Sequence, residues 1–341
     1  KLNATGDLTT ATLSGIMNAE HRNLGKIDAD FRLQRLRNNS IQIDHIKLLA
    51  PSHDTQLHAN GQWVPGSRGG NIRLDMTWQN LRWPIQEPPW FNSARGKGSL
   101  AGTIDHYQFK LSSDSPWPEL IPSAWEMNAE GNLEGLNIHS LNVTGLGGKA
   151  IATGQLNWEP ALNWKSTISI SNINPAGLWP QWPGKLNGKM SSHGNVKNGK
   201  LIAEADVTQL KGQLRGYPAS LRSRLRWHDQ VLNISLFDLS SGNSRLALAG
   251  QAGDTIKLDW NLDSKNLAAL YPQAKGQLKA KGHLTGSKQS QKIDASVVGK
   301  AIGLPGYEIG TIDGTVAADL FHWQDINIKL AAKTVKLHGY T

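Results

Sequence analysis

The sequence has no cysteine among its 341 residues, so disulfide frameworks and cysteine–metal sites are excluded. It contains no run of eighteen apolar residues, and therefore no segment with the pattern of a membrane-spanning helix. Charged residues make up only 18% of the chain and hydrophobic residues 38%. A chain this lean in hydrophobic residues predicts a thin, extended core.

Helical periodicity is nearly absent, and only residues 118–130 are compatible with one short helix. Period two dominates instead, for example over 71–78 and 256–262, where apolar and polar residues alternate. Such alternation places apolar side chains on one face of a sheet and polar side chains on the other. Short breaks rich in Gly and Asn, such as Asn198-Gly199, separate these segments. The pattern predicts an antiparallel meander.

A glycine inside a short strand returns at a nearly constant interval. Gly61, Gly154, Gly250 and Gly339 follow one another at steps of 93, 96 and 89 residues. Two glycines six apart keep the same interval in RGKGSLAG (96–102), NGKMSSHG (188–194) and KGQLKAKG (276–282). A fixed period indicates stacked repeats. We expect one continuous elongated segment over 1–341, with repeats at approximately 6–101, 102–193, 194–281 and a partial one at 282–341, and no linker-delimited domains.

The fold class expected from this pattern is all-β. A long, repeat-built, mostly antiparallel sheet twists, and it can fold lengthwise so that its apolar face lines a trough with a hydrophobic interior. Two alternatives remain open: a filled β-solenoid, which favours shorter repeats, and a sheet that packs on itself.

Each repeat also contains a break with proline, at 80–90, 174–184 and 266–272. Proline cannot donate to a sheet ladder, so these segments should leave the strands. They either cap the open side of the sheet or pack on the nearest core.

The chain carries a net charge of +9, but its basic residues are dispersed, which argues against a nucleic-acid partner. No nucleophile motif or phosphate loop is present, and the eleven histidines lack metal-ligand spacing. Gly96, Gly98 and Ala101 match a G-x-G-x-x-A string without a following helix, so we interpret them as part of a strand. We expect no enzyme activity, no catalytic residue, no metal and no cofactor.

The pattern N-x-x-x-L-x-P, followed by spaced glycines and an alternating strand, occurs at Asn174–Pro180 with Gly184–Gly188 and at Asn266–Pro272 with Gly282–Gly286. With this pattern the residues resemble the TamB family within the wider AsmA-like group. The first repeat departs from it, because Pro84 follows Asn80 without the spaced Leu and Pro. The resemblance covers essentially all 341 residues, as one portion of a longer protein.

The resemblance implies a taco-like β-groove in a periplasmic protein anchored in the inner membrane of a Gram-negative bacterium. It implies phospholipid transport between the two membranes as part of the translocation and assembly module. It also implies a partner, the outer-membrane barrel TamA, bound through regions outside this chain.

The apolar stripes are the candidate surface for lipid acyl chains, although each residue alone also fits a plain buried core. The candidates are Ile72, Leu74, Met76, Trp78, Trp164, Ile168, Ile170, Ile256, Leu258, Trp260, Leu262, Ile326, Ile328 and Leu330.

Arg222, Arg224 and Arg226 alternate with apolar residues and should share one face. They are candidates to bind lipid head groups. A solvated outer face would show the same strip, and that interpretation is favoured.

Two classes of function therefore stay open. One is a hydrophobic conduit for phospholipid, which needs an unbroken apolar interior. The alternative is a chaperone-like scaffold for outer-membrane protein and autotransporter assembly, which needs a sheet edge open to strand addition.

Overall fold

The structure, a computed structural model, describes the chain except residues 8, 22–24, 52–53, 67–68, 84–90, 117–121, 288, 320–325 and 338–341. The chain divides into two compact units, Lys1–Pro160 and Ala161–Thr341. The expectation of one continuous segment with repeat boundaries near 101, 193 and 281 stays a prediction.

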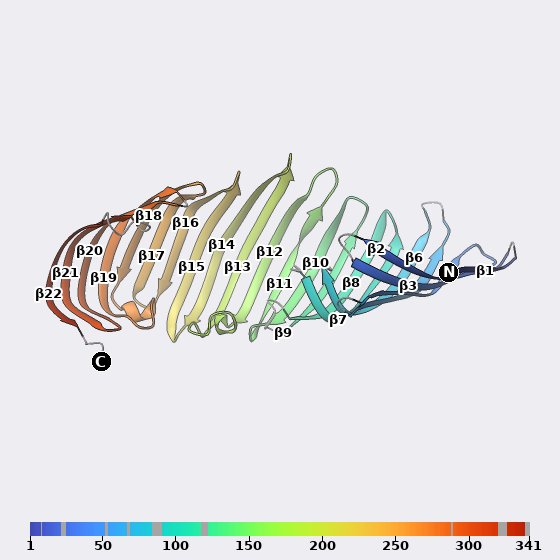
Figure 1. Cartoon of the computed structure of the whole chain (residues 1–341), viewed down its shortest axis with the longest axis horizontal. Coiled ribbons are helices and arrows are strands. Elements are labelled where there is room, and N and C mark those ends of the chain that lie inside the picture. The colour runs from blue at the N-terminus through green and yellow to red at the C-terminus, as the bar shows by residue number, and fades with distance from the viewer. Residues whose placement is uncertain are drawn as a thin grey trace. The chain divides into compact units, whose positions relative to one another are not determined.

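The first unit is a β-meander in which each strand pairs antiparallel with its neighbour in sequence (Figure 1). Its strands are β1 (Leu2–Gly6), β2 (Ala11–His21), β3 (Gly25–Arg35), β4 (Ile41–Ala50), β5 (Thr55–Val64), β6 (Asn71–Trp83), β7 (Phe91–Thr103), β8 (His106–Pro116), β9 (Pro122–Gly131), β10 (Gly135–Gly145) and β11 (Gly148–Asn157).

The second unit repeats this architecture and adds two 3₁₀ turns. Its elements are β12 (Asn163–Ile173), η2 (Pro175–Gly177), β13 (Gly184–Lys197), β14 (Lys200–Leu214), β15 (Tyr217–His228), β16 (Val231–Ser241), β17 (Ser244–Ala252), β18 (Thr255–Ser264), η3 (Leu267–Ala269), β19 (Lys275–Ser287), β20 (Gln291–Leu304), β21 (Tyr307–Asp319) and β22 (Ile326–Leu337). Figure 1 shows these strands bending, most clearly from β19 to β22. The expected all-β class, an open antiparallel sheet curved into a trough, is confirmed.

Alternation and turn chemistry explain these strands. In β19 the even-numbered residues Leu278 and Ala280 are less exposed than Lys279 and Lys281, as period two requires. The hairpin between β13 and β14 turns at Asn198 and Gly199, with φ of 52° and 73°. Two successive positive φ values are typical of a type I′ turn, which matches the twist of antiparallel strands.

The short helix expected over 118–130 is wrong where the structure describes it. Residues 122–130 belong to β9, and 117–121 lie outside the described residues. Trp125, Met127 and Ala129 alternate with Glu126 and Asn128, and this period of two outweighs the modest helix propensity of the segment.

Each sequence repeat corresponds to six strands. Gly61, Gly154 and Gly250 lie in β5, β11 and β17, whereas Gly339 lies outside the described residues. The paired glycines lie in β7, β13 and β19, again six strands apart.

A β-bulge returns with the same interval. It lies at Ile43–Ile46 in β4, Ile138–Leu141 in β10 and Ile234–Phe237 in β16. In each case the first isoleucine pairs with the repeat glycine of the next strand, Gly61, Gly154 or Gly250. Bulges increase local twist and bend a strand, so the sheet bends at an equivalent place in each of these repeats.

The proline-containing breaks leave the sheet as expected. We call residues 174–183 strap 1 and residues 265–274 strap 2; they join β12 to β13 and β18 to β19 and contain η2 and η3. Asn174 and Asn266 begin the turns, each accepting a hydrogen bond from the backbone N–H two residues on, which is the capping role of asparagine. Residues 84–90 of the first break lie outside the described residues.

Candidate functional site: the apolar faces of the two sheets

A continuous row of apolar side chains crosses all strands of the second unit. Directly paired residues of antiparallel strands lie on the same face, so the strand registers define the row. Its members are Ile170, Gly188, Leu210, Leu221, Leu239, Leu246, Leu262, Ala280, Val297, Gly314 and Leu330. Every member is aliphatic or glycine, so the row contains no polar side chain.

Other candidate residues of this unit fall into neighbouring rows on the same face. Ile168, Trp260 and Ile328 belong to one row, which Met190, Val207 and Phe237 also join. Trp164 and Ile256 share another row.

Leu258 lies between these rows and pairs with Gly250 and Leu284. The backbone of Ile326 pairs with Ala318, but its side chain lies outside the described residues.

The first unit has rows of the same kind. The candidates Ile72, Leu74, Met76 and Trp78 alternate along β6 and share one face. The row through Leu74 consists of Ala4, Leu13, Leu33, Ile43, Gly61, Leu74, Leu100, Phe109, Ala129, Ile138 and Gly154.

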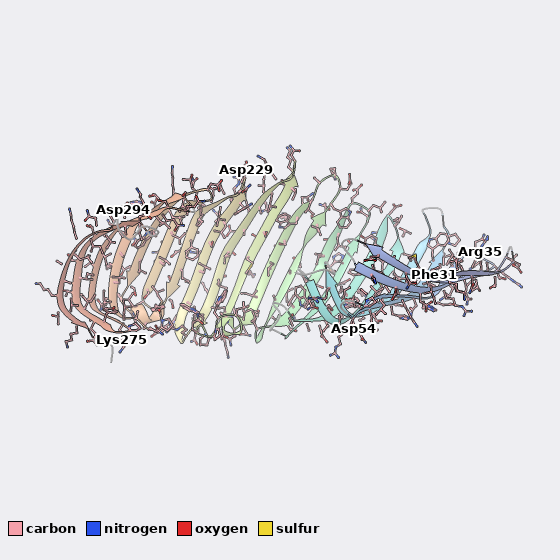
Figure 2. The ribbon with its side chains drawn as sticks, in the orientation of Figure 1. Phe31, Arg35, Asp54, Asp229, Lys275 and Asp294 are labelled. Atoms are coloured by element: carbon pink, nitrogen blue, oxygen red, sulfur yellow. The ribbon has the colours of Figure 1, made fainter. Side chains whose placement is uncertain are left out.

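The row through Met76 runs beside it and includes Phe31 of β3, which Figure 2 labels. One charged residue, Arg35, joins the row through Ile72, next to Ile41, and its guanidinium donates to the Asn39 side chain at 2.7 Å.

These apolar faces are not covered by a second sheet. Among the described residues, each strand pairs with its neighbours in the meander and no strand belongs to a second sheet; the 3₁₀ turns η2 and η3 contact β13 and β19. Large apolar side chains consequently keep much of their surface, with Trp227 38% and Ile328 52% exposed. An uncovered apolar surface of this kind indicates an interaction site.

The three candidate arginines lie on the opposite face of the sheet. Arg222, Arg224 and Arg226 alternate along β15 with Leu221, Ser223 and Leu225, whose partners belong to the apolar rows. The structure therefore does not bring the arginines together with the apolar residues.

Each of these arginines faces a carboxylate on a neighbouring strand. Arg222 binds Asp238 at 2.9 Å, Arg224 binds Asp206 at 2.9 Å, and Arg226 approaches Glu204 at 3.5 Å. Asp238 also accepts from Arg245 at 2.7 Å. Hydrogen bonds from Arg245 and Arg222 hold the pKa of Asp238 below its ordinary value.

A shallow hollow of about 850 Å³ on the second unit is lined by polar-face side chains, among them Arg222, Asp238, Arg245, Lys281 and His283. Members of the row through Trp260, among them Phe237, Leu248 and Trp260 itself, also line this hollow.

Pairs of tryptophan and glycine on adjacent strands were not anticipated from the sequence. Trp78 faces Gly96, Trp164 faces Gly194 and Trp260 faces Gly282, once in each strand pair that a proline-containing break joins. Indole rings of Trp78 and Trp164 occupy the space that a Cβ at Gly96 or Gly194 would need. The signal was present, because the paired glycines and the alternating tryptophans both follow the repeat.

Two classes of site are absent from the part of the chain that the structure describes. No helix there has the length and apolar character needed to cross a bilayer. No group of three His, Cys, Asp or Glu residues there is close enough to hold a metal ion.

Comparison with known proteins identifies relatives of the chain. The family model described as TamB, N-terminal domain, matches residues 25–341. The chain is 24% identical over 298 residues to "Translocation and assembly module subunit TamB" of Haemophilus influenzae. The alignment covers 84% of this chain and 22% of that relative, so the chain spans less than a quarter of the relative's length. No solved structure matches the chain.

Proposed function

Because the chain belongs to the TamB family, as the match of its N-terminal domain over residues 25–341 shows, we propose that its apolar faces form a hydrophobic conduit for phospholipid. In this proposal the chain is part of a periplasmic protein anchored in the inner membrane. The conduit carries lipid between the inner and outer membranes as part of a translocation and assembly module. It needs no catalytic residue and no cofactor, since no covalent bond changes.

The observation that supports this proposal is the continuity of the apolar rows. In each unit they cross from the first strand to the last, and no second sheet covers them. Acyl chains lying along these rows gain about 0.8 kcal/mol per buried methylene. Head groups stay in water, because burying them without partners costs several kcal/mol.

The alternative is a scaffold for outer-membrane protein and autotransporter assembly, with TamA bound outside this chain. Strand addition to a client needs an unpaired sheet edge. Strands β2–β10 and β13–β21 are hydrogen-bonded on both sides. These strands therefore present faces and not edges, and this favours the conduit.

A charge placed in an apolar row tests the proposal. Leu258→Asp puts a carboxylate on the apolar face of β18, and Asn261→Asp adds the same charge on the exposed polar face of the same strand. We expect Leu258→Asp to slow transfer of fluorescent phospholipid between donor and acceptor vesicles about tenfold or more, because an unpaired carboxylate in an apolar environment costs several kcal/mol.

Asn261→Asp should transfer lipid at the native rate. If Leu258→Asp keeps its native circular dichroism spectrum and still transfers lipid at the native rate, the conduit is wrong. Crosslinks from either unit to client polypeptides, without bound lipid, would favour the scaffold.

A further inference from the structure

One edge of the second unit's sheet carries both straps. We call strap rim the edge formed by straps 1 and 2 and the hairpins at residues 215–216, 242–243 and 305–306. The strand registers place these five connections at the same end of the strands. Figure 1 draws the coils of both 3₁₀ turns at this edge, and Figure 2 labels Lys275 there.

Each strap presents one aromatic side chain to solvent at an equivalent position. Trp179 and Tyr271 are each the fifth residue after the asparagine that begins the strap, and each precedes a proline. They are 57% and 52% exposed. The backbone N–H of Trp179 donates to the Pro175 carbonyl and that of Tyr271 to the Leu267 carbonyl, both at 2.8 Å. The same exposed ring therefore occurs twice in the same local setting.

The inner residues of strap 2 hold its exposed ring in place. Leu267 and Ala274 pack with Ile302 of β20, and the Ser241 hydroxyl donates to the Ala269 carbonyl at 2.9 Å. A group that is already ordered loses little conformational entropy when it binds. The ring therefore stands on a fixed support that favours contact with a partner.

Exposed apolar residues continue along the strap rim beyond strap 2. Leu304 and Tyr307 pair with each other across the hairpin at 305–306 and are 44% and 48% exposed. Straps 1 and 2 are six strands apart, which separates Trp179 from Tyr271 by roughly 29 Å along the rim. One small ligand does not span this distance, so the rim fits an extended partner.

Basic residues accompany these rings. Arg215 and Lys265 lie in the connections themselves, and Lys185 and Lys275 are among the first two residues of the strands that follow the straps. None of the five connections contains Asp or Glu. The strap rim therefore combines aromatic and basic side chains.

The positive charge of the chain also lies in this unit. Residues 161–341 contain 22 Lys and Arg and 12 Asp and Glu, whereas residues 1–160 contain 14 and 15. The carboxylates that flank the connections of the strap rim, Asp263 and Glu308, lie in β18 and β21, and Asp263 pairs with Lys279 at 3.2 Å. An excess of one charge attracts partners of the opposite charge, so the partner of this rim is anionic.

We propose that the strap rim is a docking surface for a membrane that contains anionic phospholipid. Tryptophan and tyrosine favour the boundary between apolar and wet surroundings, so the rings of Trp179, Tyr271 and Tyr307 enter the head-group layer. The basic side chains between them bind the lipid phosphates. Rings six strands apart suit a fluid layer, which each ring enters independently. The proposal does not depend on the conduit, in which single lipids lie on the apolar face.

Two pairs of lysines give matched variants for a test. Lys265 and Lys275 are exposed at the strap rim, and Lys197 and Lys257 are exposed near the opposite end of the strands. Replacing either pair by alanine removes the same charge. A difference between the two double variants therefore reports position and not net charge.

Flotation with vesicles measures the docking. The vesicles contain phosphatidylcholine alone or an equal mixture of phosphatidylcholine and phosphatidylglycerol. We expect the native chain to partition onto the anionic vesicles at least about tenfold more strongly than onto the neutral ones. Lys265→Ala/Lys275→Ala should weaken this partitioning about twentyfold, because each basic residue near an anionic surface contributes about fivefold. Lys197→Ala/Lys257→Ala should weaken it less than about threefold, because screening limits distant charges.

Three outcomes of the flotation overturn the proposal. They are an equal loss from both lysine pairs, partitioning that is as strong on neutral vesicles, and no partitioning at all. Retention of polyglutamate by a chain that does not bind vesicles would assign the rim to an acidic polypeptide instead.

Fluorescent labels locate the surface that touches the vesicle. Since the chain has no cysteine, Gln181→Cys in strap 1 and Asn195→Cys near the far end of β13 each give one exposed site. An environment-sensitive label at 181 should shift its emission to shorter wavelength on anionic vesicles, and a head-group nitroxide should quench it. The label at 195, roughly 35 Å along the strand from the rim, should show neither effect. Equal effects at both positions contradict docking by the strap rim.

Tryptophan substitutions test the aromatic part of the surface. Trp179→Ala should weaken partitioning onto anionic vesicles at least about threefold. Trp227→Ala, which removes a ring 38% exposed near the other end of β15, should leave it unchanged. The reverse pattern overturns the proposal.

Leu258→Asp separates failure of this proposal from failure of the conduit. This variant should lose bound phospholipid and keep native partitioning onto anionic vesicles, whereas Lys265→Ala/Lys275→Ala should keep bound phospholipid and lose partitioning. If Leu258→Asp loses partitioning and the lysine variant keeps it, vesicles contact the apolar face and the strap rim is not the docking surface.

Discussion

At the scale of single residues, the repeat glycines provide space for their cross-strand neighbours. Gly96 of β7 lies opposite Trp78 of β6, whose side chain is 6% exposed and whose Nε1 donates to Ser93 Oγ at 2.7 Å. The indole ring lies where a side chain at Gly96 would have to be. The spacing of the glycines was visible in the sequence, but their partners depend on the strand register, which alternation alone does not determine.

Gly96→Ala should destabilise the first unit. The added methyl group would overlap the ring of Trp78, and overpacking of this kind costs about 1–3 kcal/mol. Urea denaturation followed by tryptophan fluorescence measures the loss in the free energy of unfolding.

Gly98→Ala on the same strand is the matched control. A Cβ at Gly98 would meet Met76 and Trp78 at 3.5 Å, an ordinary contact distance, so the free energy of unfolding should change by less than about 1 kcal/mol. Equal effects of both substitutions would contradict the assigned role of Gly96.

Asp238 makes stability depend on acid pH. Arg245 and Arg222 lower the pKa of this buried carboxyl in the folded state. Its stabilising contribution is therefore complete above the unfolded pKa, about 3.9, and is lost as the pH falls through the lower folded pKa. Asp238→Asn should be less stable than the native chain at pH 7, with a difference that narrows below about pH 4. Denaturation curves across this pH range measure the difference in the free energy of unfolding between the two proteins. A difference that stays constant with pH would contradict the stabilising role of the ionised Asp238.

At the scale of elements, alternation in the sequence was enough to locate the strands, because one face is apolar and the other polar. It did not reveal the bulges that follow Ile43, Ile138 and Ile234, each of which inserts one residue relative to the partner strand, because one interruption of the alternation can equally mark the end of a strand. It also left the role of the straps open. The sequence allowed the straps either to cap the open side of the sheet or to pack on the nearest core. Strap 2 packs on Leu278 and Ile302, and this contact is compatible with both roles.

The side-chain contacts of Arg215 should stabilise the second unit, whereas its backbone conformation in the turn should not. Its φ is 54°, a region that favours glycine, so Arg215→Gly relieves backbone strain while it removes the bond to Ala268 and the contact with Trp182. We expect a net loss of about 1–2 kcal/mol in the free energy of unfolding, measured by urea denaturation.

The hairpin between β15 and β16 offers the control for this prediction. Gln230 has a φ of 63° and lies at the end of the strands opposite to the straps. Gln230→Gly should keep or slightly raise stability, because it relieves the same strain without loss of a strap contact. If Arg215→Gly also raises the free energy of unfolding, the contacts by which Arg215 links the two straps do not stabilise the second unit.

At the scale of the whole molecule, the all-β class and the candidate apolar residues followed from the sequence, because both depend on period two. The rows did not, since they require the register of every strand pair. The ion pairs did not follow from the sequence either, because they also depend on the register. Arg222, Arg224 and Arg226 share a face as expected, and the carboxylates that pair with them come from strands β14 and β16.

The central claim is that the apolar rows hold phospholipid acyl chains. Mass spectrometry of lipids extracted from the purified chain tests it most directly, with Leu258→Asp and Asn261→Asp purified in parallel. The account predicts phospholipid with the native chain and with Asn261→Asp, and its loss with Leu258→Asp. A natively folded chain that carries no phospholipid, or equal amounts of it in all three proteins, would contradict the account.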